Sequence, residues 1–225
     1  MSRHPLYPVI LSHLSSTDGD SYLLDVGCGL GQDLRKLHYD GAQLQRTYAV
    51  EFEQGLIDSG FDLFMDSNQS KTNFIAGDAL KDDPSQWLKI FGIENGFNIV
   101  HVGALFHLFD WNDQLLIAKN LISLTRKEKN PVVFGWQFAA RQSGLVSLGP
   151  DKEAQIYGHN EDSMKRFWNE IGESTGTAWS LQLRCEWSEP DKVAGLAKDG
   201  KWGDAAGSGG NAGRNGIMRF SVQRV

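Results

Sequence analysis

The hydrophobic positions of the chain fall into short apolar runs that alternate with longer segments of helical spacing. Runs of four to six mostly apolar residues predict strands at Tyr22–Val26, Thr47–Phe52, Asn73–Ala76, Phe97–Val102 and Pro131–Phe134. Apolar residues that recur every three or four positions predict helices at Asp33–Tyr39, Leu56–Phe64, Pro84–Phe91 and Leu115–Leu124. Strands that alternate with helices form right-handed crossovers, so the pattern predicts a doubly wound α/β fold with a mostly parallel sheet.

The last part of the chain departs from this alternation. Asp162–Ser174 has helical spacing, and Ala178–Trp187 and Ile217–Val225 are predicted to pair as antiparallel strands. The segment from Gly195 to Gly216 holds eight glycines in 22 residues, and Trp202 is almost its only large apolar residue. Such a segment cannot offset its own ordering entropy, which predicts a mobile loop inserted between the two strands. A lid over a substrate is the alternative interpretation.

Length and composition fit one water-soluble globular domain over residues 1–225. The chain has a mass of 25.0 kDa, with 40% hydrophobic and 22% charged residues. A net charge of −6 and the lack of a basic stripe in the sequence disfavour nucleic-acid binding. The apolar run within Met1–Ser12 is too short for a membrane span or a signal peptide, so we expect no membrane association.

The two cysteines of the chain, Cys28 and Cys185, lie far apart and form no metal-ligand spacing. We therefore expect free thiols, a cytoplasmic protein and no bound metal. Cys28 lies inside a glycine turn, where we expect it to act as a small packing residue rather than as a nucleophile.

That turn, Asp25-Val26-Gly27-Cys28-Gly29-Leu30-Gly31, directly follows the first predicted strand. Glycines at alternate positions let the backbone bend sharply and approach a bound nucleoside closely. A dinucleotide-binding fingerprint would have its third glycine where Gln32 lies, so a nicotinamide-dependent oxidoreductase is the weaker interpretation.

Two carboxylates follow the next two predicted strands. Glu51 ends the second strand and Asp78 follows the third, so parallel pairing places both on the same edge of the sheet as the glycine turn. A carboxylate can accept hydrogen bonds from both ribose hydroxyls, and another can accept one from an adenine amino group. The set predicts S-adenosylmethionine, a nucleoside without phosphates. Either acid alone is also consistent with a helix cap.

Two segments carry a family resemblance: ALFHLFDWNDQ, which contains HLFDW, and YGHNEDSMKRFW, which contains HNEDS. In these segments most specifically, and over nearly the whole chain from Arg3, the sequence resembles the fungal small-molecule methyltransferases of polyketide and meroterpenoid pathways. The resemblance implies a class I methyltransferase fold, Rossmann-like, with seven strands of which the last is antiparallel. It further implies methyl transfer to an oxygen of a small secondary metabolite, in several relatives a carboxylate and otherwise a hydroxyl.

The resemblance also assigns roles to individual positions. It implies that the cofactor is bound by Asp25, Gly27, Gly29 and Gly31 of the first motif, by Glu51 at the ribose, by Asp78 and Ala79 at the adenine, and by Val102 and Gly103 beside the methionine portion. It places His107 near the transferred methyl group.

Methyl transfer from a sulfonium is an in-line displacement, so positioning of the acceptor oxygen should dominate catalysis. An ionised carboxylate needs no general base, whereas a phenol would benefit from a histidine, His107 first and His159 second. A structural hydrogen-bonding role is the alternative for both, and His101, inside a buried strand, is expected to be packed. Of the nearby aromatic residues, two or three are expected to line an acceptor pocket: Phe106, Phe109, Trp111, Trp136, Phe138 and Trp168.

The sequence departs from this family in one respect that bears on activity. Its members carry a longer segment before the residues that match Ser2–Pro5, and that segment helps to enclose cofactor and substrate. A non-catalytic methyltransferase-like protein that acts as a binding or partner subunit is therefore the alternative function.

Overall fold

The computed structural model describes residues 1–67, 73–128, 130–148, 154–187 and 216–225. Its main sheet has seven strands in the order β3-β2-β1-β4-β5-β9-β8. The strands are β1 (Leu23–Val26), β2 (Thr47–Glu51), β3 (Phe74–Ala76), β4 (Ile99–Gly103), β5 (Val132–Ala139), β8 (Trp179–Trp187) and β9 (Gly216–Arg224). Neighbours from β3 to β5 pair in parallel, and β9 runs antiparallel to both β5 and β8. The predicted sheet with an antiparallel last strand is confirmed.

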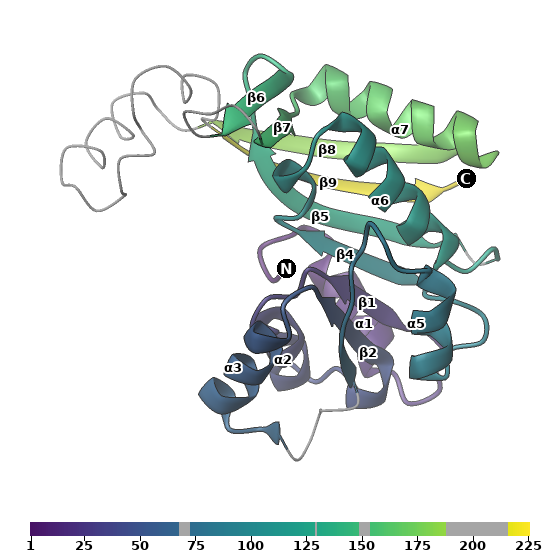
Figure 1. Cartoon of the computed structure of the whole chain (residues 1–225). Coiled ribbons are helices and arrows are strands. Elements are labelled where there is room, and N and C mark those ends of the chain that lie inside the picture. Colours follow the sequence, from purple (N-terminus) through teal and green to yellow (C-terminus); the bar gives the residue numbers. More distant parts are fainter. Residues whose placement is uncertain (68–72, 129, 149–153, 188–215) are drawn as a thin grey trace.

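Helices cover both faces of this sheet (Figure 1). One face packs against α1 (Tyr7–Ser15), α2 (Gln32–Tyr39) and α3 (Gln54–Phe64). The other packs against α5 (Pro84–Phe91), α6 (Trp111–Ser123) and α7 (Glu161–Thr175). Side chains alternate along a strand, so Leu23 belongs to the first core and Leu24 to the second. The doubly wound architecture is therefore also confirmed.

Two short helical turns also belong to the described elements, η1 (Leu44–Arg46) before β2 and η3 (Phe106–Leu108) after β4. The carboxylate of Asp110 begins α6 by accepting a hydrogen bond from the Asp113 amide at 2.9 Å. This cap fixes the start of α6 shortly after η3, which carries His107.

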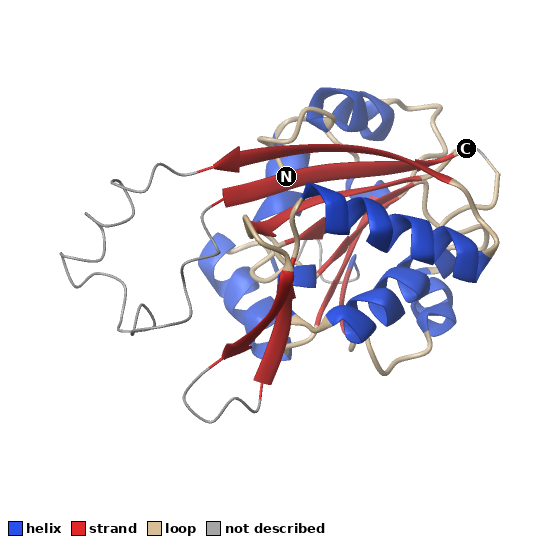
Figure 2. Ribbon diagram, turned by 90° about the horizontal axis from the view of Figure 1, so that it is seen from above, coloured by secondary structure: helices blue, strands red, loops and turns tan. Residues whose placement is uncertain are grey.

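A hairpin of β6 (Gly144–Leu148) and β7 (Ala154–Gly158) was not predicted from the sequence. Seen from above, it projects away from the main sheet (Figure 2). Strand β5 is longer than the predicted Pro131–Phe134, because Gly135 lets it continue: a Cβ there would lie 1.9 Å from the carbonyl oxygen of Val102.

The glycine-rich segment from 195 to 215 lies outside the described residues, and Gly216 is the first residue of β9. Its loop and lid interpretations stay predictions, as does the assignment of residues 1–225 to a single domain. Among the described helices, none has both the length and the apolar character that a membrane crossing requires.

Candidate functional site

The glycine turn lies between β1 and α2, at the carboxyl end of β1. Gly27, Gly29 and Gly31 have φ angles of 72°, 57° and 70°, in the left-handed region that side chains with a Cβ rarely adopt. The amides of Gly27 and Cys28 both donate to the carbonyl of Val50 in β2, at 2.9 and 3.3 Å. Cys28 is buried, and burial raises the pKa of its thiol, as expected for a packing residue.

Strand β3 and helix α3 lie very close to the glycine turn. A Cβ at Gly31 would lie 2.5 Å from Cε1 of Phe74 in β3. A Cβ at Gly60 in α3 would lie 2.4 Å from the carbonyl oxygen of Leu30. Glycine at both positions therefore lets β3 and α3 approach the turn.

Glu51 joins the turn to the end of β2. Its side chain is buried, and its Oε2 accepts a hydrogen bond from the Gly29 amide at 2.8 Å. Oε1 accepts a longer one from the amide of Glu53, at 3.3 Å. A carboxylate offers about four acceptor positions, so Glu51 keeps capacity for a ligand's hydroxyl groups.

A hollow of about 420 Å³ opens at these strand ends. We call it the strand-end hollow, and it is lined by Val26, Gly27, Val50, Glu51, Phe52, Gly77, Asp78, Ala79, Leu80, Lys81, Ala104, Leu105, Leu108 and Phe109. Four of the predicted cofactor residues thus meet in one cavity: Gly27, Glu51, Asp78 and Ala79.

Asp78 stabilises a local turn and also lines this hollow. Its Oδ1 accepts a hydrogen bond from the Leu80 amide at 2.9 Å, and its Oδ2 lies 3.6 Å from Nζ of Lys81. Its side chain keeps 21% of its surface exposed. The carboxylate therefore stabilises its own turn and still has acceptor positions open to a ligand.

The predicted catalytic histidines lie in different surroundings. His107 is buried in η3, with its ring edge-on to Phe138 of β5 at a centroid distance of 4.7 Å. His159 is 1% exposed, with Nε2 donating to Oε1 of Gln114 at 2.9 Å and Nδ1 lying 3.0 Å from Oγ of Ser163. Neither ring lines the strand-end hollow, and a catalytic role of either stays a prediction.

The other predicted cofactor residues do not line the strand-end hollow: Asp25, Gly29, Gly31, Val102 and Gly103. Val102 is packed in the core. Of the six aromatic residues considered for an acceptor pocket, Phe109 lines the strand-end hollow, Phe138 is 42% exposed, and Phe106 and Trp168 are buried in the core.

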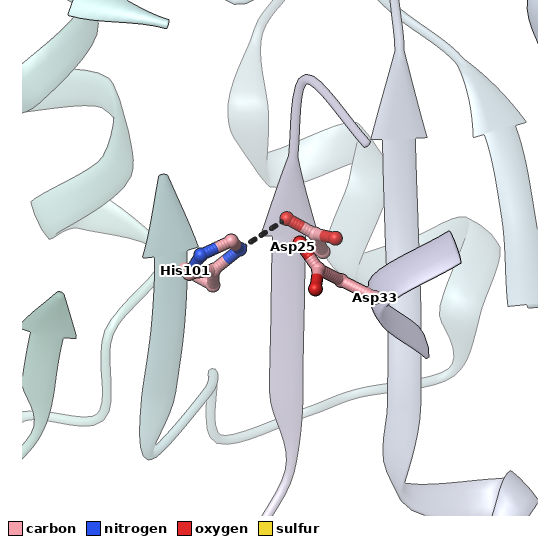
Figure 3. Close-up of side chains that lie close together, drawn as sticks. All are labelled: Asp25, Asp33 and His101. Atoms are coloured by element: carbon pink, nitrogen blue, oxygen red, sulfur yellow. Dashed lines mark hydrogen bonds and ion pairs between the residues drawn. The ribbon is translucent and has the colours of Figure 1, made fainter. Parts of the chain in front are cut away.

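Asp25 faces the opposite side of β1 from Val26, because residues alternate along a strand. Its Oδ1 lies 2.7 Å from Nδ1 of His101 on β4, and both side chains are almost fully buried. Together with Asp33 at the start of α2 they form a close group (Figure 3), in which one candidate ligand atom of each residue lies within 4.8 Å of the others. Asp33 is already engaged, since its Oδ1 lies 2.8 Å from the α-ammonium of Met1.

This group borders a second hollow, of about 320 Å³. We call it the N-terminal hollow, and it is lined by Met1, Ser2, Arg3, His4, Gln32, Asp33, His101, Gly135, Trp136, Ile217 and Arg219. The sequence interpretation missed the link between Asp25 and His101, although strands β1 and β4 pair with these two residues opposite each other. Only the pairing register could have revealed it.

No protein-family model matches the chain. The chain is 38% identical to the O-methyltransferase phiE of a fungal species (strain ATCC 74256), over 82% of this chain and 59% of phiE. It is 31% identical to the methyltransferase adrK of Penicillium roqueforti, over 86% of this chain and 66% of adrK. The chain is a homologue of these fungal small-molecule methyltransferases.

The homology confirms the resemblance that the sequence motifs indicated. A further fungal homologue, the O-methyltransferase atr3 of Stereocaulon alpinum, is 30% identical over 81% of this chain and 51% of atr3. The chain spans between about half and two thirds of the length of these curated relatives.

Solved structures support the fold assignment. The 1,6-didemethyltoxoflavin-N1-methyltransferase of Burkholderia thailandensis is 11% identical and has a TM-score of 0.59, over 97% of this chain and 76% of that one. An S-adenosylmethionine-dependent methyltransferase of Mesorhizobium loti is 10% identical, with a TM-score of 0.56 over 97% of both chains. The methyltransferase homologue therefore has the class I, Rossmann-like methyltransferase fold.

Proposed function

We propose that this protein binds S-adenosylmethionine and transfers its methyl group to an oxygen of a small molecule. The observation that carries the proposal is the strand-end hollow, which gathers Gly27 of the glycine turn, Glu51, Asp78 and Ala79 in one cavity. Ligands of doubly wound sheets bind beyond the carboxyl ends of the strands, where this hollow lies.

The donor groups of the hollow suit an adenosine. Glu51 is buried and fixed by Gly29, so it can accept hydrogen bonds from ribose hydroxyls without reorganising. Asp78 can accept a hydrogen bond from the adenine amino group. Leu105 and Phe109 supply apolar surface for the base.

Gly103 and Val102 then lie beside the methionine portion, and Asp25 below it. The cofactor supplies an electrophilic methyl group on a sulfonium, and the protein's task is to hold the acceptor oxygen in line with it. Structural neighbours include a magnesium protoporphyrin IX methyltransferase of Synechocystis with bound S-adenosylmethionine, at a TM-score of 0.52. The homologues phiE and atr3 are named as O-methyltransferases, which supports an oxygen as the acceptor.

On the acceptor side, we assign the proton-accepting role to His107. It matters only for a hydroxyl acceptor, because a carboxylate is already ionised near neutral pH. His159 is the weaker candidate, because both of its ring nitrogens already have partners. A net charge of −6 favours a small molecule over a nucleic acid, and the free thiols of Cys28 and Cys185 favour the reducing cytoplasm.

The test combines binding with turnover. Isothermal titration with S-adenosylmethionine and S-adenosylhomocysteine should give one site per chain. Incubation with the cofactor and a panel of aromatic and terpenoid acids and phenols should give products heavier by one methyl group. Absence of both binding and turnover would refute the proposal, and binding without methyl transfer to any member of the panel would favour a non-catalytic binding protein.

A further inference from the structure

His101 and Asp25 form a buried pair that the proposed methyl transfer does not use. Their side chains are only 2% and 3% exposed, and Nδ1 of His101 lies 2.7 Å from Oδ1 of Asp25. A carboxylate can only accept at this distance, so Nδ1 carries the hydrogen. In the neutral ring this tautomer leaves a lone pair on Nε2.

That Nε2 is buried and has no hydrogen-bond partner among the residues that the structure describes. A buried polar atom without a partner is costly, so this one points to a ligand atom. His101 lines the N-terminal hollow, which indicates where such an atom would come from.

Gly103 lies next to the same imidazole ring. A Cβ at Gly103 would lie 2.8 Å from Cε1 and 3.3 Å from Nε2 of His101, and 3.3 Å from Nε1 of Trp136. A side chain at residue 103 would therefore crowd the ring edge that carries Nε2, and glycine keeps that edge free of such a side chain.

We propose that His101 is a positioning residue that accepts a hydrogen bond, through Nε2, from the α-ammonium of the cofactor's amino acid end, and that Asp25 fixes the tautomer this requires. The inference rests on the proposed function. A nucleoside in the strand-end hollow has its ribose at Glu51 and its 5′ side toward Gly27. The amino acid end then passes over Gly27 and Gly103 toward His101.

Charges of both signs lie near His101. The carboxylates of Asp25 and Asp33 belong to the same close group as His101 and favour a cation beside its ring, whereas Met1, Arg3 and Arg219 bring positive charge to the lining of the N-terminal hollow. A primary ammonium has only donors, which complements the lone pair on Nε2. Asp33 is already paired with the α-ammonium of Met1. Among the described residues, the unpartnered acceptor in this group is therefore Nε2 of His101.

The experiment compares two nucleosides that differ only at the amino acid end. S-adenosylhomocysteine carries it, whereas 5′-deoxy-5′-methylthioadenosine keeps the adenosine and the sulfur without it. His101→Asn retains an amide that can donate to Asp25 but has no acceptor at the Nε2 position. We expect His101→Asn to weaken S-adenosylhomocysteine binding at least about ten-fold, and to change methylthioadenosine binding less than about two-fold.

Two variants make the result specific. His101→Gln can place its amide oxygen near the Nε2 position, so it should recover part of the lost affinity. His38→Asn changes a half-buried histidine of α2 that lines neither hollow, and should leave the affinities for both nucleosides unchanged. Thermal unfolding of each variant checks that it is folded.

Equal weakening of both nucleosides by His101→Asn, or weakening of neither, would overturn the inference and leave the proposed function standing. Failure of the unsubstituted protein to bind either nucleoside would overturn both. The titrations are repeated with EDTA and with added Mg²⁺ or Zn²⁺. If a metal is needed for S-adenosylhomocysteine to bind more tightly than methylthioadenosine, the group of Asp25, Asp33 and His101 holds a metal and the inference is wrong.

Discussion

Glu51 Oε2 accepts a hydrogen bond from the backbone amide of Gly29 at 2.8 Å, so the acid that ends β2 holds the turn that ends β1. The same buried carboxylate lines the strand-end hollow. Its position is therefore set by the turn before any ligand arrives, and its charge strengthens the hydrogen bond to the turn. If Glu51 binds the cofactor as proposed, the same residue contributes both to stability and to ligand binding.

Replacing Glu51 should separate these two contributions. Glu51→Ala removes the acceptor for Gly29 and the ligand group together, so we expect unfolding free energy to fall by about 1 to 3 kcal/mol and S-adenosylhomocysteine affinity to fall at least about ten-fold. Glu51→Gln keeps an acceptor oxygen for the Gly29 amide. Its loss of unfolding free energy should therefore be smaller than its loss of binding free energy for S-adenosylhomocysteine. Urea unfolding and calorimetric titration measure the two quantities.

The neighbouring Glu53 provides the control, because its side chain is exposed and lines neither hollow. Glu53→Gln should change neither the stability nor the affinity. If Glu51→Ala bound S-adenosylhomocysteine as tightly as the unsubstituted protein, Glu51 would not be part of the cofactor site.

The close approach of α3 to the glycine turn gives a second prediction. Gly60→Ala would place a Cβ 2.4 Å from the carbonyl oxygen of Leu30, so α3 has to move away from the turn. We expect a loss of about 1 to 3 kcal/mol in unfolding free energy, together with weaker cofactor binding. Differential scanning calorimetry and titration measure these effects.

Gly55 in the same helix is the matched control, because a Cβ there meets no atom within 4 Å. Gly55→Ala should be neutral or stabilising by up to about 1 kcal/mol, as expected from helix propensity. Equal effects of the two substitutions would show that the contact with Leu30 does not restrict residue 60.

Much of the strand-end hollow could be predicted from the sequence. The apolar runs located β1, β2 and β3 to within about a residue, because buried parallel strands read as continuous hydrophobic segments. Once the strands are parallel, the residues that follow them share one edge of the sheet. That rule brought Gly27, Glu51 and Asp78 together without knowledge of any contact.

The Asp25–His101 pair could not be predicted, because it depends on the register of β1 against β4. Alternation along each strand shows which residues share a face, but not which residue of the neighbouring strand lies opposite. The sequence therefore grouped Asp25 with the glycines that follow it, whereas its carboxylate faces His101 on the side of the sheet covered by α1. The hairpin of β6 and β7 was missed because it is short and depends on tertiary pairing.

A third prediction concerns acid. Burial lowers the pKa of His159 from 6.5 to about 4, so the folded protein binds this proton less readily than the unfolded chain. Unfolding free energy should therefore be unaffected by this group above pH 6.5 and fall as the pH drops from 6.5 toward 4, by at most about 1.4 kcal/mol per pH unit. Burial lowers the pKa of His4 in the same direction, also to about 4.

Urea unfolding across this pH range tests the assignment. His159→Gln cannot be protonated, so its unfolding free energy should fall less steeply with acid while being lower at neutral pH, where the bonds to Gln114 and Ser163 are lost. An acid dependence identical to that of the unsubstituted protein would show that His159 does not contribute to it.

The last prediction separates the two classes of methyl acceptor. If His107 takes the proton of a hydroxyl acceptor, His107→Gln should lower kcat for phenols by about 10²- to 10⁴-fold. The same variant should methylate carboxylic acids at nearly the original rate, since those acceptors are ionised already. Product formation by both classes is measured by mass spectrometry at saturating cofactor.

Phe138→Leu is the control for this comparison, because Phe138 contacts the His107 ring without any titratable group. It should affect both acceptor classes alike, through packing alone. An equal loss for phenols and acids in His107→Gln would make His107 a structural residue, and an undiminished rate with phenols would exclude it as the base. Only a selective loss with phenols, accompanied by unchanged binding of S-adenosylhomocysteine, supports proton transfer to His107.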